Sequence, residues 1–270
     1  MHAGAAVSLS VLWLLTGCAG GAARSGATGQ PSTPVSDYRP VETIVTGTSR
    51  TRAKAHTDLG LAYLEAGNVA VALDEGRKAL GDDSSYASAH NLMGLAHMYL
   101  DEKGLARESF EQALRLGGND PDINNNFGWF LCQNGDTTRA MAMFEAAATN
   151  PLYATPTRPL TNAALCAIKA NDMQAAEVNF LRAIAADSNN AQAVFGLASL
   201  FFHKGDYLEA RRQLSDFHTL RDPVAESLWL AVRIERKLGD KVSESGYASQ
   251  LRRKFAGSPE HQLLMQGKFD

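Results

Sequence analysis

The stretch Asp122–Pro159, DINNNFGWFLCQNGDTTRAMAMFEAAATNPLYATPTRP, holds two short helical patterns of small and apolar residues. Gly135-Asp136 separates the two patterns, and Asn150-Pro151 ends the second. The residues that set the helical spacing are Phe127, Gly128 and Leu131 in the first pattern and Ala140, Phe144 and Ala147 in the second. Two short helices of this kind cannot bury their apolar faces alone, so they need similar pairs on either side. The stretch therefore predicts one unit of a helical repeat.

The rest of the chain repeats these residue types at an interval of 34 residues. The matching positions are Gly60, Gly94 and Gly128, then Ala72, Ala106 and Ala140, then Phe110 and Phe144, and, after a two-residue insertion, Ala176, Phe180, Ala183, Ala210 and Leu214. The period, the two small positions and the aromatic residue four places after the second resemble the tetratricopeptide repeat. The resemblance implies an all-α solenoid, a superhelix of about six helix–turn–helix repeats.

The frame divides the solenoid, expected at 51–270, into successive repeats. They are expected near 53–86, 87–120, 121–156, 157–190 and 191–224, with a degenerate sixth near 225–257 and a C-terminal cap. In the sixth repeat Glu244 stands where a small residue is expected. A polar, off-pattern last unit suits the end of a solenoid, because its outer face meets water. The recurrent Gly, Ala and Phe positions are interpreted as packing residues.

The composition and net charge of the chain limit the classes of partner that it is expected to bind. The 270 residues are 45% hydrophobic and 20% charged, with a formal net charge of −3. A nucleic-acid-binding surface would show a basic excess, so no nucleic-acid partner is expected. Lys and Arg are scattered along the predicted helices, which argues against a polybasic membrane-binding patch.

The first 17 residues have the features of an export signal. The apolar run from Ala5 to Leu15 is too short to span a bilayer and leads into Leu15-Thr16-Gly17-Cys18. This ending resembles the lipobox of bacterial lipoproteins, which implies cleavage before Cys18 and attachment of a diacylglycerol and an acyl chain to that residue. Several acyl chains anchor a protein far more firmly than one. The alternative is an ordinary signal peptide with a chance cysteine. Ala19, rather than Asp, follows the cysteine and favours the outer membrane.

Residues 18–50 are expected to connect the lipidated cysteine to the solenoid. This segment is rich in Gly, Ala, Ser, Thr and Pro and cannot bury enough apolar surface to fold. We interpret it as a flexible tether with a root-mean-square reach of roughly 30 Å.

The two other cysteines are expected to form a disulfide. Cys132 lies in the first helix of the third repeat and Cys166 in the first helix of the fourth, and first helices of successive repeats are neighbours. Export would place both thiols in an oxidising compartment. The alternative is a pair of separate buried thiols, since free cysteine is among the most buried residue types.

No catalytic or metal-binding motif is present. The sequence has no HExxH, GxxxxGK, GxGxxG or GxSxG motif. His56 and His90 occupy the same repeat position, which indicates periodicity rather than metal ligation. The sequence therefore predicts neither an enzyme nor a cofactor beyond the lipid on Cys18. An enzyme or carrier with a small-molecule site in the groove is the alternative from another class, and convergent polar residues would support it.

The first helices of the repeats are expected to line a groove for a protein partner. Its inward positions in this frame are Lys54, Leu61, Asn91, Leu95, Met98, Asn125, Trp129, Asn162, Leu165, Phe195, Phe202 and Trp229. Such a surface suits an amphipathic helix or an extended peptide, with the asparagines holding its backbone. Trp129 and Trp229 are the large aromatic residues typical of binding hot spots. The alternative is that several of these side chains are covered by neighbouring helices and belong to the core.

Thr57 and Leu61 in the first repeat replace the polar residues with which chaperone-binding repeat proteins hold a terminal carboxylate, so that mode is disfavoured.

With the lipobox, the repeats and the stretch Asn125–Gly135, Asn150–Pro156 and Cys166 together, the chain resembles the PilF/PilW family of type IV pilus biogenesis lipoproteins. The resemblance implies an outer-membrane lipoprotein that faces the periplasm and acts as the pilotin of the pilus secretin, promoting its localisation and multimerisation and hence pilus assembly and twitching motility. It maps Cys18 to the lipidated cysteine, and Cys132 and Cys166 to the family's paired cysteines. The alternative is an adaptor lipoprotein of another envelope machine, in outer-membrane protein assembly or the control of cell-wall synthesis.

Overall fold

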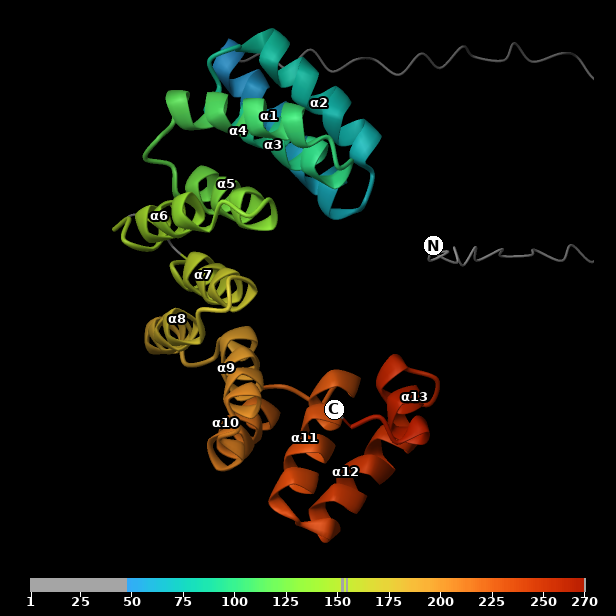
Figure 1. Cartoon of the computed structure of the whole chain (residues 1–270). Helices are drawn as coiled ribbons and strands as arrows, with labels where there is room; N and C mark the ends of the chain where they lie inside the picture. Colours follow the sequence, from blue (N-terminus) through green and yellow to red (C-terminus); the bar gives the residue numbers. More distant parts are fainter. Residues whose placement is uncertain (1–47, 152, 154, 270) are drawn as a thin grey trace, which may run out of the picture. The chain divides into compact units, whose positions relative to one another are not determined.

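The computed structural model describes residues 48–151, 153 and 155–269, and all regular secondary structure in this part of the chain is helical (Figure 1). The predicted all-α fold is therefore confirmed. The predicted signal peptide 1–17, the lipidated Cys18 and nearly all of the predicted tether lie outside the described residues. One boundary differs from expectation, because the first helix begins at Ser49, where the hydroxyl of Thr48 accepts a hydrogen bond from the Thr51 amide.

Each predicted repeat range holds one pair of helices, and one further helix follows. The pairs are α1 (Ser49–Glu65) with α2 (Val69–Asp82), α3 (Ala87–Tyr99) with α4 (Lys103–Leu116), α5 (Pro121–Gln133) with α6 (Thr137–Ala148), α7 (Thr157–Lys169) with α8 (Met173–Ala186), α9 (Ala191–Lys204) with α10 (Tyr207–Leu220), and α11 (Ala225–Leu238) with α12 (Lys241–Lys254). The last helix is α13 (Pro259–Gln266).

The turn inside each pair recurs in the sequence and explains why every pair has the same geometry. A residue with positive φ ends the first helix in all six repeats, namely Gly67, Asp101, Gly135, Asn171, Gly205 and Gly239. In the last four repeats an aspartate follows at once, and its carboxylate accepts the amide three residues further on; these caps are Asp136, Asp172, Asp206 and Asp240. The local sequence thus stops one helix and starts the next at a fixed interval.

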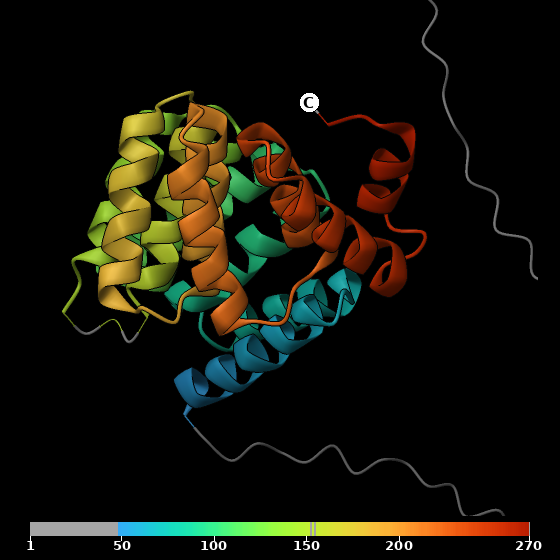
Figure 2. The ribbon, with the colours of Figure 1, turned by 90° about the horizontal axis from the view of Figure 1, so that it is seen from below.

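The helices form two layers within residues 48–269. Each odd-numbered helix packs against its own partner and against the next odd-numbered helix, from α1 through α13. The even-numbered helices pack only against the odd-numbered ones, so the first helices make one continuous inner layer and the second helices an outer layer (Figures 1 and 2). Corresponding positions in successive first helices therefore become neighbours in space.

Aromatic rings fill the space between the layers. Phe110, Phe127 and Phe130 are fully buried, with ring centroids 5.5–6.2 Å apart. The recurrent glycines make room for such rings. A Cβ at Gly94 would lie 2.8 Å from the Phe110 ring, and one at Gly128 would lie 2.9 Å from Phe144. The paired Gly and Phe positions are thus packing partners across the helix pairs of the second and third repeats.

The sixth repeat, whose sequence departs from the repeat pattern, forms a pair of helices, α11 and α12. Glu244, the residue that breaks the frame, lies on α12 and accepts hydrogen bonds from Arg236 at 2.8 Å and Lys241 at 2.9 Å. Helix α13 begins 34 residues after α11 and takes the position of the first helix of a seventh repeat. Its Leu264 is 8% exposed and packs with Leu228 and Trp229, so α13 covers the apolar end of the solenoid.

No helix among residues 48–269 (152 and 154 set aside) combines the length and the hydrophobicity needed to cross a bilayer.

Candidate functional site

The exposed face of the inner layer carries an apolar row at one repeat position. Leu61, Leu95 and Trp129 occupy this position on α1, α3 and α5, and each is only partly buried. Leu61 and Leu95 line a depression of about 410 Å³ that also involves α5 and the start of α7. Leu95 and Trp129 line an adjoining depression of about 230 Å³. Because the two depressions share Leu95, Asn126 and Arg158, they form one surface, which we call the N-terminal groove.

Trp129 is the most prominent side chain of the N-terminal groove. On one side it faces Leu95 and Asn162, and on the other it lines a further depression of about 330 Å³ with Met98 and Gln133. The buried part of the Trp129 side chain packs against the aromatic cluster between the two helical layers. The indole is therefore held in place by the core while part of its surface stays open, which is the arrangement expected of a binding anchor.

Asparagines form a hydrogen-bonded chain beside the apolar row. The side-chain amide of Asn162 on α7 donates to Oδ1 of Asn125 at 2.9 Å, and the Asn125 amide donates to Oδ1 of Asn126 at 3.2 Å. Asn126 in turn donates to Asn91 on α3 at 3.3 Å. Asn91 and Asn125 are 5% and 2% exposed, whereas Asn126 and Asn162 are half-buried. The expectation that Asn91 and Asn125 hold a partner's backbone is thus corrected, because these amides tie three first helices together.

The N-terminal groove also contains a charged cluster that the sequence analysis did not identify. Arg158 on α7 donates to Asn126 at 3.1 Å and lies 3.6 Å from the Asp122 carboxylate. The Tyr153 hydroxyl donates to the same carboxylate at 3.0 Å. Burial raises the pKa of the Tyr153 phenol, and the nearby Asp122 charge acts in the same direction. The signal was present in the frame, since Asp122 and Arg158 occupy the same position in consecutive repeats once the two-residue insertion is counted.

Carboxylates dominate the charge of the groove. Among the described residues, the larger depression is lined by the carboxylates of Asp58, Glu65, Asp120 and Asp122 and by a single cation, Arg158. Lys54 lies on the same helix as Asp58 and makes an ion pair with it at 2.6 Å. The hydrogen bond to Asp58 raises the pKa of Lys54. This lysine is therefore held by its own helix rather than placed inside a depression.

The structure brings only the N-terminal part of the predicted groove into one surface. Leu61, Asn91, Leu95, Asn125, Trp129 and Asn162 meet there. Leu165 and Phe195 are half-buried and line neither depression; Leu165 packs against the core around α7 and α8, and Phe195 packs against Phe217 of α10 with ring centroids 5.2 Å apart.

Trp229 is a correction to the predicted hot spots. Its side chain is 7% exposed, and the ring of Phe269 stacks on it with centroids 5.4 Å apart. The segment that follows α13 thus covers the inner face of α11. Trp229 therefore belongs to the core at the C-terminal end of the solenoid and not to an open groove.

A disulfide joins the two first helices that meet at Trp129. The sulfurs of Cys132 on α5 and Cys166 on α7 are bonded, with 5.8 Å between the Cα atoms. This is the pair that the adjacency of first helices predicts. Cys132 follows Asn125 by seven residues on α5 and Cys166 follows Asn162 by four on α7, so the bond links the two helices that carry the groove's polar side.

No three His, Cys, Asp or Glu side chains between residues 48 and 269, positions 152 and 154 apart, are grouped so that they could hold a metal ion. What the N-terminal groove offers is an apolar row, half-buried amides and fixed charges, which is a surface for recognising a polypeptide.

Known proteins share both sequence and fold with this chain. A family model described as tetratricopeptide repeat matches residues 91–159 and 161–216. A Pseudomonas aeruginosa protein named type IV pilus assembly protein PilF is 28% identical over 214 residues, which are 79% of this chain and 85% of that protein.

Two solved structures superpose over most of the chain. The structure of Pseudomonas aeruginosa PilF matches with a TM-score of 0.71 and 27% identity, covering 82% of this chain and all of that one. The structure of PilW, described as a widely conserved type IV pilus biogenesis factor, matches with a TM-score of 0.73 and 28% identity, covering 79% of this chain and 98% of that one.

Proposed function

Since this chain belongs to the PilF/PilW family of tetratricopeptide-repeat proteins, we propose that it is a lipid-anchored factor of type IV pilus biogenesis that binds subunits of the pilus secretin. The observation that carries the proposal is the open apolar row Leu61, Leu95 and Trp129 in the N-terminal groove. A soluble partner with an exposed apolar segment is the natural ligand of such a row.

The groove binds an amphipathic helix or an extended segment of a secretin subunit. Apolar side chains of the segment cover Leu95 and Trp129, and covering one large apolar side chain contributes about 1.5–3 kcal/mol. Asn126 and Asn162 are half-buried and offer the remaining amide atoms for the segment's backbone. Asn91 and Asn125 act behind them as supports.

The acyl chains place this binding surface at the membrane where secretin rings form. In the proposal they are attached to Cys18, and the protein lies in the inner leaflet of the outer membrane and faces the periplasm. A tether of the length of residues 18–47 gives the solenoid a reach of about 30 Å. Binding covers apolar surface on a secretin monomer, brings it to the membrane and promotes multimerisation. The protein works as a scaffold, without catalysis or a cofactor other than its lipid.

The anchor and the function are tested together by Cys18→Ser. We expect the variant to lose incorporation of labelled palmitate and to move from the outer-membrane fraction to the soluble fraction. The amount of multimeric secretin in the outer membrane should fall with it, because monomers are no longer carried to the membrane. The measurements are palmitate labelling, fractionation and quantification of secretin multimers in cells.

The matched control is Ala19→Ser, which makes a similar change one residue away and should keep both label and location. Persistent palmitate on the Cys18→Ser variant would refute the attachment site. Normal secretin multimers in cells whose protein is wholly soluble would refute the proposed role of the anchor.

A further inference from the structure

The N-terminal groove has an apolar floor that a ligand can reach. Leu61 on α1 and Leu95 on α3 are half-buried, and Tyr99, one helical turn after Leu95, is 62% exposed. All three side chains line the larger depression of about 410 Å³. The open apolar surface therefore extends from the middle of these helices to the end of α3, where it finishes in an exposed aromatic ring.

A carboxylate lies at the same end of the groove. Glu65 on α1 has the same repeat position as Tyr99 on α3, and both side chains line the larger depression. Glu65 is the last residue of α1, where the partial negative charge of the helix C-terminus disfavours a carboxylate. In the first helices of the next five repeats this position is neutral or basic, with Tyr99, Gln133, Lys169, His203 and Lys237. Helix α1 thus ends in a residue that its own dipole disfavours, and such breaks of a local rule are expected at functional sites.

The other three carboxylates of the larger depression are already engaged. Asp122 lies 3.6 Å from the guanidinium of Arg158. Asp58 makes an ion pair with Lys54 at 2.6 Å. Asp120 caps α5 and accepts the Asp122 amide at 2.9 Å. The carboxylate at the end of α1 is instead exposed, beside an exposed tyrosine ring, and can meet a ligand.

We propose that the N-terminal groove binds a polypeptide segment in which a Lys or Arg lies within four residues of a large apolar side chain. This inference rests on the proposed function and names the chemistry of the segment that the groove holds. The apolar side chain covers Leu61 and Leu95. The cation lies between Glu65 and the Tyr99 ring, about 6 Å further along the helices, which is the rise of four helical residues. There it gains both an ion pair and the attraction of an aromatic face.

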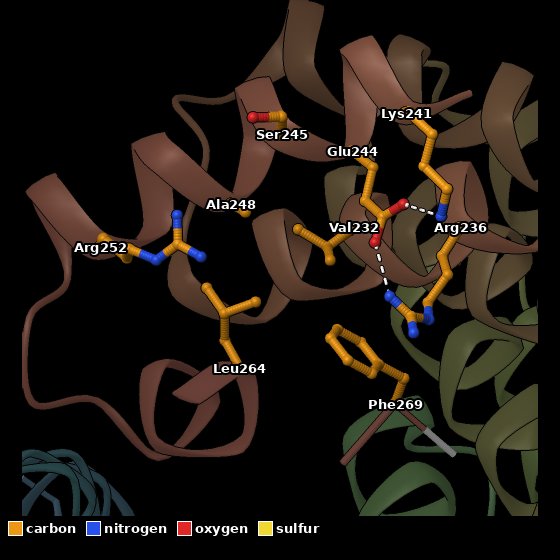
Figure 3. Close-up of a pocket in the computed structure, with 9 residues that line it drawn as sticks. All are labelled: Val232, Arg236, Lys241, Glu244, Ser245, Ala248, Arg252, Leu264 and Phe269. Atoms are coloured by element: carbon orange, nitrogen blue, oxygen red, sulfur yellow. Dashed lines mark hydrogen bonds and ion pairs between the residues drawn. The ribbon is translucent and has the colours of Figure 1, made fainter. Parts of the chain in front are cut away.

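The charge of the solenoid favours such a segment at this end over the other. Residues 48–224 contain sixteen Lys and Arg against twenty-one Asp and Glu, whereas residues 225–270 contain eight against six. On α12 the carboxylate of Glu244 already accepts from Arg236 at 2.8 Å and from Lys241 at 2.9 Å (Figure 3). Complementary charge speeds association and disfavours wrong partners. A basic segment is therefore attracted to the N-terminal groove rather than to the last repeat.

The test uses the full chain in detergent micelles and two probes, the purified secretin and an immobilised library of random dodecapeptides with blocked termini. Retained peptides should be enriched about fivefold in Lys and Arg over Gln near a large apolar residue, the size expected for one exposed ion pair with a cation–π contact. Glu65→Gln should abolish this enrichment, and Glu65→Lys should shift it to Asp and Glu. Both changes suit a helix C-terminus, so circular dichroism should show unchanged helicity.

The matched control is Glu108→Gln on α4. Glu108 is exposed on an outer-layer helix, and its replacement removes the same charge outside the groove. This variant should keep the enrichment and the dissociation constant of the secretin complex. Glu65→Gln should raise that dissociation constant about fivefold in low salt and by less in high salt, because salt screens exposed charges.

The two probes separate this inference from the proposed function. Equal retention of basic peptides and their Gln counterparts, with secretin affinity unchanged by Glu65→Gln, would overturn the inference and leave secretin binding in place. An equal loss in Glu65→Gln and Glu108→Gln would reduce the effect to net charge and overturn the inference as well. Enrichment of basic peptides that depends on Glu65, without any binding of secretin, would support the ligand chemistry and overturn the proposed partner.

Discussion

Trp129→Ala combined with Leu95→Ala is expected to weaken binding of the secretin segment by roughly 100-fold or more. Truncating one central aromatic anchor costs about 2 kcal/mol or more of binding free energy, and removing a neighbouring leucine adds to that loss. The two side chains lie on adjacent first helices and line the same depression, so the double variant flattens the floor of the N-terminal groove. The measurement is the dissociation constant of the purified protein and secretin.

The control is Leu181→Ala on α8. Leu181 is an exposed apolar residue of similar size, 47% exposed, on an outer-layer helix. It should leave the dissociation constant unchanged. Since Trp129 also packs on the aromatic cluster, the helicity and the melting temperature of the double variant are recorded alongside. Unaltered affinity in a folded double variant would place the binding site elsewhere on the protein.

Removal of the disulfide is expected to lower the free energy of unfolding by about 3–4 kcal/mol, the value that the chain-entropy model assigns to a closed loop of this length. Cys132 and Cys166 are separated by 34 residues and join α5 to α7. Stability in a repeat protein depends on each unit and its contacts with the next. The loss should therefore fall on the interface between the third and fourth repeats.

The measurement is urea unfolding of the Cys132→Ala/Cys166→Ala variant, followed by circular dichroism. Alanine at both positions avoids burying an unpaired hydroxyl, and the original protein in reductant provides the matched comparison. Two reactive thiols in the denatured, unreduced protein would contradict the disulfide. Identical unfolding curves for the original and reduced proteins would contradict its contribution to stability.

The repeats could be predicted from the sequence because the same packing contacts recur in successive repeats. Gly94 and Gly128 face Phe110 and Phe144 in successive repeats, so the same residue types return every 34 positions. The same frame predicted the adjacency of α5 and α7 and hence the pairing of Cys132 with Cys166. Position in the repeat also placed Leu61, Leu95 and Trp129 in a single row, which the structure shows as one face.

Contacts made by segments outside the repeats could not be predicted from the repeat frame. The repeat frame did not predict that Phe269, which follows α13, stacks on Trp229 and leaves it 7% exposed. The repeat frame does not predict side-chain rotamers. It therefore could not predict that the side-chain amides of Asn91 and Asn125 are hydrogen-bonded to other asparagines.

The Arg158–Asp122 ion pair was not predicted, because the two-residue insertion before α7 shifts the numbering of corresponding repeat positions. The two residues match only after that shift is applied. Periodicity thus predicts the scaffold, while irregular segments decide which parts of its inner face remain open.

Site-specific photocrosslinking in cells tests whether the N-terminal groove contacts the secretin. A photoreactive phenylalanine analogue placed at Trp129 keeps an aromatic group in the groove, and the same analogue at Leu181 on α8 reports on the outer layer. We predict a crosslinked adduct between the secretin subunit and the protein labelled at position 129, and none from position 181. An adduct from position 129 with a different envelope protein, or secretin adducts of equal yield from both positions, would contradict secretin binding in the N-terminal groove.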